Sequence, residues 1–94
     1  MNSLNHLAIS KKLALAIGWS EDDLYDHFGV LKALVDRGYQ DFDYRDWAVA
    51  GAVAERYGLL VDFELCRVLA QRTGWVHADT PQLAIALAVI GSKA

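Results

Sequence analysis

Arginine and aromatic side chains occur close together at several points of this 94-residue chain. Arg72 and Trp75 flank a turn-forming glycine, and Tyr44 and Arg45 lie in the acidic stretch "FDYRD". An arginine can pair with a phosphate while a neighbouring ring stacks on a base. The pattern therefore indicates a binding surface for a ligand, to which we assign the candidate residues Arg37, Tyr39, Tyr44, Arg45, Trp47, Arg67, Arg72, Trp75 and His77.

These candidates also have ordinary structural interpretations, which the sequence leaves open. Arginines in turns keep a chain soluble, and aromatic residues pack on sheets. Tyr44 and Arg45 lie where a strand leads into a helix, whose free N–H groups attract an anion. The alternative there is helix capping together with an Arg–Asp pair on the surface.

Residues that perform catalysis or bind metals are sparse. The histidines do not stand at ligand spacing from one another, and the single Cys66 has no partner in a CxxC pattern. His77 lies near Asp79, but no nucleophile stands out beside them. No phosphate-binding glycine loop is present. We therefore expect no enzyme activity, no metal and no cofactor.

Composition limits the class of protein. Hydrophobic residues make up 54% of the chain, enough for one core, so we expect a single domain spanning residues 1–94. The net charge of −3, with acids and bases interspersed, argues against a duplex-DNA partner. The apolar runs are too short to span a membrane. A lone cysteine and no signal-peptide pattern indicate the cytoplasm, and the small core favours a homo-oligomer.

The first third of the chain predicts helical structure. Residues 3–17 place apolar side chains on one broad face, and Gly18 follows where a C-cap is needed. Ser20 and the acidic residues 21–23 indicate a second helix start, because acidic side chains stabilise the first turn.

Two later helices are indicated by their caps and their small apolar residues. One follows Asp43 or Asp46 and ends at Gly58, and the last follows Asp79 or Thr80. Segments 30–42 and 59–78 are ambiguous. Their periodicity permits helices, whereas the glycines after their charged turns permit hairpins.

An internal repeat bears on this ambiguity. "GYQDFDYRDWAVAGAV" (residues 38–53) aligns with "GWVHADTPQLAIALAV" (residues 74–89) after a shift of 36 positions. The repeat predicts one unit used twice: turn glycine, aromatic strand, acidic cap and helix. We therefore expect an α+β fold, with an N-terminal helix followed by two strand-strand-helix units and four strands in one small antiparallel sheet. The alternative is an all-α array of helical hairpins.

Three stretches resemble small proteins of bacteriophages and prophages: "LALAIGW" (residues 13–19), "FDYRDWAVA" (residues 42–50) and "ADTPQLAIALAVI" (residues 78–90). They are similar to the phage ABA-sandwich group, in which a sheet lies between helices. Trp47 departs from the pattern, since related sequences often carry proline there. The resemblance implies a phage origin and a host-cytoplasm setting, and its motifs contain no catalytic residue.

These observations together predict a non-catalytic binding protein. We expect it to counteract a bacterial defence, either by sequestering a nucleotide signal or by occluding a host defence protein. The alternative is a structural or regulatory protein–protein interaction module of phage or host machinery.

Overall fold

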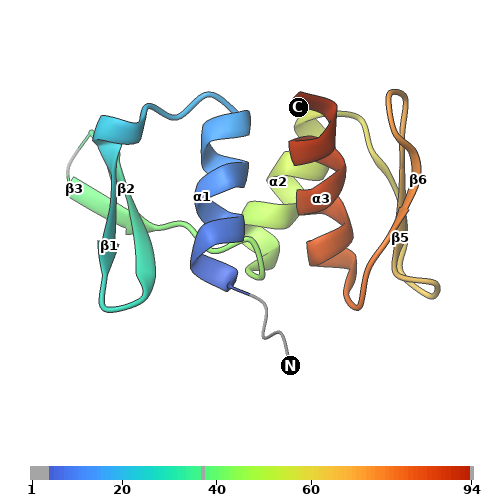
Figure 1. Cartoon of the computed structure of the whole chain (residues 1–94), viewed down its shortest axis with the longest axis horizontal. Helices are drawn as coiled ribbons and strands as arrows, with labels where there is room; N and C mark the ends of the chain where they lie inside the picture. Colours follow the sequence, from blue (N-terminus) through green and yellow to red (C-terminus); the bar gives the residue numbers. More distant parts are fainter. Residues whose placement is uncertain (1–4, 37, 94) are drawn as a thin grey trace.

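The computed structural model describes residues 5–36 and 38–93. Within them, one helix is followed by two groups, each made of three strands and a helix (Figure 1). A single 3-10 turn, η1 (Glu21–Asp23), precedes the first group. The helices are α1 (His6–Ala16), α2 (Trp47–Arg56) and α3 (Pro81–Lys93), and the strands are β1 (Leu24–His27), β2 (Val30–Val35), β3 (Gly38–Asp41), β4 (Leu60–Asp62), β5 (Arg67–Ala70) and β6 (Gly74–His77).

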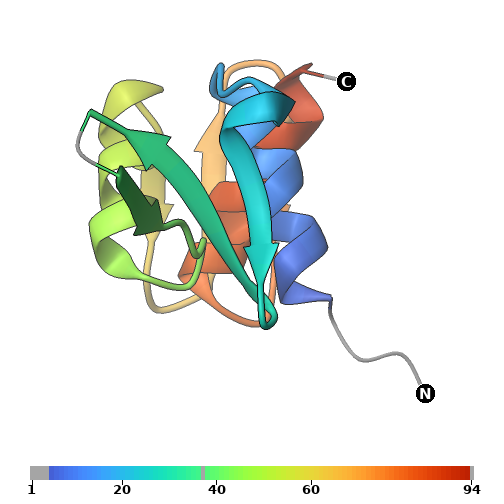
Figure 2. The same ribbon diagram turned by 90° about the vertical axis from the view of Figure 1, so that its left-hand side faces the viewer.

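The strands form two separate antiparallel sheets. Sheet A has the order β1-β2-β3, and sheet B has the order β4-β5-β6. The three helices lie between the sheets in Figure 1, and Figure 2 shows sheet A in front of them. Helix α3 contacts α1, α2 and sheet B, while α1 contacts β2. The molecule thus has three layers: sheet, helices and sheet.

This architecture confirms the α+β class, and the all-helical alternative is wrong. Both ambiguous segments form strands, but the single four-stranded sheet is replaced by two three-stranded sheets. The layer order is also the reverse of the one that the phage resemblance implied. The physical reason lies in α3, whose side chains Leu83 to Ala86 are all buried. A helix that is apolar all round needs cover on every side, so it lies in the middle layer.

Local capping explains where the helices begin and end. Gly18 adopts φ +110° after α1, as expected of a C-cap glycine. The carboxylate of Asp46 accepts a hydrogen bond from the N–H of Ala48 at the start of α2. At α3, the hydroxyl of Thr80 accepts from the N–H of Leu83. The sequence left two possible caps for each of these helices, Asp43 or Asp46 and Asp79 or Thr80. In both cases the cap is the residue directly before the helix.

The helix expected after Ser20 is the main local error of the sequence reading. Ser20 does cap a turn, since its hydroxyl accepts from the N–H of Asp22, but the turn ends at once in β1. The cause is the two-residue turn Phe28–Gly29, in which both residues have positive φ (53° and 82°). Such a turn matches the twist of antiparallel strands and joins β1 to β2.

The 36-residue repeat is present in the structure. Strand β6 and strand β3 begin 36 residues apart, at Gly74 and Gly38, and each leads into a central helix. The turns differ in length: two residues join β2 to β3, whereas three join β5 to β6. The repeat therefore specifies the order of elements, while each unit has its own strand register.

The core lies mainly between the sheets and α3. Ala33 on sheet A and Val68 on sheet B are fully buried from opposite sides, and Leu13 of α1 is also buried. The one buried polar side chain among the described residues is Ser10, whose hydroxyl accepts a hydrogen bond from the N–H of Tyr44. This bond joins α1 to the segment that leads into α2.

Candidate functional site

A pocket of about 510 Å³ opens where α2 ends, beside the turn between β5 and β6 and the last turns of α3. Its volume is in the range of small-molecule sites. The end of α2 contributes Tyr57, Gly58 and Leu59; strand β5 and its turn contribute Ala70, Gln71 and Arg72; and α3 contributes Val89 and Ser92.

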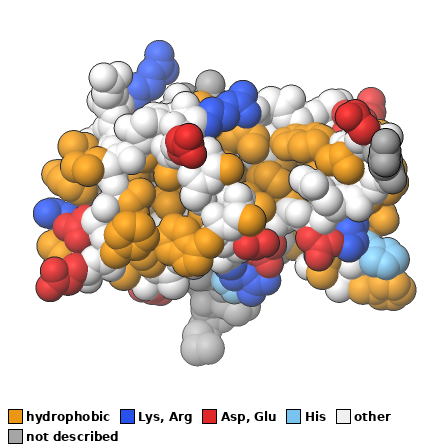
Figure 3. All heavy atoms as spheres, turned by 180° about the vertical axis from the view of Figure 1, so that it is seen from behind, with side chains coloured by type: hydrophobic (Ala, Val, Ile, Leu, Met, Phe, Trp, Pro, Cys, Tyr) orange, Lys and Arg blue, Asp and Glu red, His pale blue; other side chains and the backbone are white. Residues whose placement is uncertain are grey.

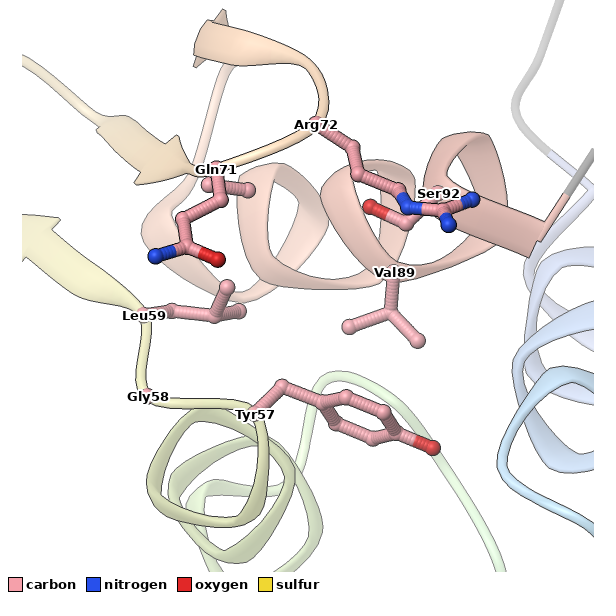
Figure 4. A pocket seen from close by; sticks show the side chains of 8 residues that line it. Tyr57, Gly58, Leu59, Gln71, Arg72, Val89 and Ser92 are labelled. Atoms are coloured by element: carbon pink, nitrogen blue, oxygen red, sulfur yellow. The ribbon is translucent and has the colours of Figure 1, made fainter.

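Polar groups stand around an apolar floor in this pocket. Figure 4 shows Arg72 reaching along α3 toward Ser92, with the ring of Tyr57 on the opposite wall and Val89 between them. The hydroxyl of Ser92 donates to the carbonyl of Ala88 at 2.8 Å, so its lone pairs face outward as acceptors. Among the described residues, no carboxylate forms a salt bridge with Arg72.

The electrostatic character of the pocket is positive. The guanidinium carbon of Arg56 lies 5.4 Å from the ring centroid of Tyr57, which places a second cation beside this wall. The last carbonyls of α2 carry partial negative charge, but the N–H groups of Gly58 and Leu59 donate to two of them. In the part of the lining that the structure describes, there is no Asp, Glu, His or Cys. The arrangement can bind an anion with a planar ring, and it supplies no general base.

Among the predicted residues that the structure describes, Arg72 alone lines the pocket. Three others meet elsewhere, on the outer face of sheet B. The guanidinium carbon of Arg67 lies 4.0 Å from the ring centroid of Trp75, and its Nε donates to the Asp62 carboxylate at 3.0 Å. His77 lies opposite Arg67 in the register of the sheet.

The Asp62 carboxylate accepts hydrogen bonds from the N–H of Leu65 and from the Arg67 side chain. The N–H of Leu65 lowers the pKa of the Asp62 carboxyl most, and the Arg67 guanidinium lowers it further. Leu69 lies between Leu60 and Trp75 on the same face, because it pairs with both across the sheet. The outer face of sheet B is therefore mixed: Leu60, Leu69 and Trp75 are apolar, and Asp62 and Arg67 form an ion pair among them.

Tyr44 is placed in the core, contrary to its assignment as a ligand contact. Its side chain is 1% exposed, and its hydroxyl lies 2.6 Å from Nδ1 of His6. Burial raises the pKa of Tyr44. Along the extended segment before α2, the side chains of Phe42 and Tyr44 point into the core, whereas those of Asp43 and Arg45 point outward. A ligand therefore has no access to this phenol.

Arg45 and Trp47, which follow Tyr44 and point outward, are accessible to solvent but interact with other side chains. Arg45 binds Asp43 with two N–H groups, at 3.0 Å from Nε to Oδ1 and 2.7 Å from Nη2 to Oδ2. This side-chain pairing lowers the pKa of Asp43 and raises that of Arg45. Trp47 is 44% exposed, and its ring packs on Phe63 with 5.5 Å between centroids.

The remaining two candidates do not join the pocket. Tyr39 lies on sheet A, at the other end of the molecule, where its ring meets the edge of Tyr25 at 4.6 Å. Arg37 lies outside the described residues. The sequence reading missed Tyr57, Gln71 and Ser92. Of these three residues, only Tyr57 could have been singled out from the sequence, because it stands immediately before the glycine that ends its helix.

Comparisons with protein-family models, with curated proteins and with solved structures found no match for this chain. Over residues 5–36 and 38–93, no helix has the length and apolar character needed to cross a membrane. The same residues hold no cluster of three or more side chains suited to a metal ion.

Proposed function

We propose that this protein is a non-catalytic binder that sequesters a small anionic ligand with a planar ring, of the nucleotide class, in the pocket beside Arg72. One observation carries the proposal: a guanidinium without a described carboxylate partner stands over an apolar floor in a pocket of about 510 Å³. Arginine suits phosphate because its fork of N–H groups matches the oxygen geometry.

The other lining groups fit the same ligand class. The ring of Tyr57 offers a stacking face, and the amide of Gln71 can donate to and accept from the edge of a base. The phage-like motifs support the wider proposal that the ligand is a nucleotide signal of a bacterial defence. Removing such a signal needs tight binding and no bond cleavage, for which this lining is suited.

The test is a thermal melt with a panel of cyclic dinucleotides, cyclic trinucleotides and ADP-ribose derivatives. A ligand at a hundred times its Kd stabilises the folded state by about 2.7 kcal/mol, which raises Tm by roughly 10–20 °C in a domain of this size. Arg72→Ala should weaken binding about tenfold or more, because a charge-assisted hydrogen bond is lost. Lys12→Ala, an exposed cation on α1, is the matched control and should keep the full shift.

Sequestration is distinguished from turnover by recovering the ligand. After incubation and denaturation of the protein, chromatography should return the ligand intact. A panel without any shift in Tm, or an equal loss of affinity in both variants, would refute the proposed site.

A further inference from the structure

Phe28 is the most exposed large apolar side chain of the described residues, at 94%. It also has φ +53°, a left-handed conformation that is unfavourable for a bulky residue. Asp26 holds the turn, because its carboxylate accepts from the N–H of Gly29 at 2.8 Å. The ring of His27 meets that of Phe28 with 4.7 Å between centroids. The exposed phenyl group contributes nothing to the core of the isolated chain.

Charge is unevenly distributed between this end of the molecule and the rest. The segment 20–43, which contains sheet A, has seven acidic residues and only two basic ones, whereas basic residues outnumber acidic ones by seven to five in the remainder. The acidic residues are Glu21, Asp22, Asp23, Asp26, Asp36, Asp41 and Asp43. Two such ends repel each other, and each attracts the remainder of another copy.

The pocket beside Arg72 is complementary to this turn. Its floor of Leu59, Ala70 and Val89 is apolar and its volume exceeds that of a phenyl ring, while the charge at its rim is positive. In Figure 1 the β1–β2 turn lies at the lower left, whereas the ends of α2 and α3 and the β5–β6 turn, whose residues line the pocket, lie toward the upper right, so the turn and the pocket cannot meet within one chain. Figure 3 shows hydrophobic and histidine side chains protruding together at the sheet A end.

We propose that Phe28 of one copy inserts into the pocket beside Arg72 of a second copy, with Asp26 of the same turn facing the arginine. The contact joins two different surfaces, so it is heterologous and links copies head to tail into closed rings or open chains. The inference uses the pocket of the proposed function but does not depend on a nucleotide. A small ligand in the pocket would exclude Phe28, so ligand and assembly compete.

Sedimentation velocity over a range of protein concentrations tests this contact. The wild-type protein should form concentration-dependent oligomers, whereas Phe28→Asn and Arg72→Glu should each remain monomeric. Asparagine suits the left-handed position, and Arg72 is exposed, so both variants should fold. An equimolar mixture of the two should form a dimer and nothing larger, because one variant keeps the pocket and the other keeps Phe28.

Matched control variants distinguish this contact from non-specific association. Phe63→Asn changes another exposed phenylalanine, and Lys12→Glu reverses another exposed cation; both should assemble like the wild type. A monomeric wild type, oligomers that persist in Phe28→Asn, or a mixture that stays monomeric would overturn the proposal. Phe28→Asn keeps the pocket, so its ligand-dependent rise in Tm tests the proposed function separately.

Discussion

Asp43 and Arg45 show how a dense run of charged residues can be structural. Their side chains are paired by two short N–H to oxygen contacts at the surface, with 33% and 54% of the side chains exposed. Asp43 also accepts a hydrogen bond from the N–H of Arg45 at 2.9 Å, which shapes the loop before α2. The pair thus keeps a backbone turn in place rather than presenting a free anion site.

This pair predicts a small loss of stability in acid. The Arg45 side chain lowers the pKa of Asp43 in the folded state, so the carboxylate stabilises the fold above its unfolded pKa of 3.8. That contribution is lost as the pH falls through the still lower folded value. Urea unfolding of wild type and Asp43→Asn should differ by under about 1 kcal/mol at neutral pH, since the pair is partly exposed. The difference should shrink below about pH 4; a constant difference would contradict this assignment.

At the same scale, Arg72 and Tyr44 show what local sequence can predict about a site. The exposure of Arg72 follows from its position, because an arginine in a turn is accessible wherever the turn lies; its role as a ligand contact stays a prediction. Tyr44 was expected at the surface because charged residues stand on both sides of it in "FDYRD". Its ring is buried because the side chains of Phe42 and Tyr44 both point inward along the extended segment. The pocket partners Gln71 and Ser92 come from separate elements, and no local pattern places them together.

Among the elements, helix caps give a direct test of the structural assignment. Asp46→Ala and Thr80→Ala should each destabilise the fold by about 1 kcal/mol, because each removes the acceptor for a free N–H at a helix start. Asp79→Ala is the control, since Asp79 is exposed and Thr80 caps α3. Urea midpoints measure all three. Equal losses for Asp79→Ala and Thr80→Ala would show that the cap lies one residue earlier.

The strands that could be predicted from the sequence are those next to a recognisable turn residue. The hairpin strands β2, β3, β5 and β6 were expected as one alternative because Gly38 and Gly74 mark turns, and the repeat reinforced them. Strands β1 and β4 were not expected as strands in their own right. They span only four and three residues and contain acidic side chains, which locally resemble a helix start. Their pairing depends on the neighbouring strand, so a short window could not reveal it.

At the scale of the whole molecule, the two repeated units share one core. Helix α3 packs on α1 as well as on its own sheet B, so the first unit has no complete core without the second. A fragment comprising residues 1–58 should therefore lack a cooperative thermal transition in circular dichroism, while the full chain shows one. A cooperative transition in the fragment would mean that the units fold independently.

The alanines of α3 have a consequence for how this protein tolerates mutation. Ala84, Ala86 and Ala88 are fully buried in the layer between the two sheets. Any larger side chain at these positions must force the layers apart, and overpacking a close-packed core typically costs about 1–3 kcal/mol. In a saturation library, the least replaceable positions of the chain should therefore include some of its smallest side chains, while the conspicuous tryptophans at the surface accept many substitutes.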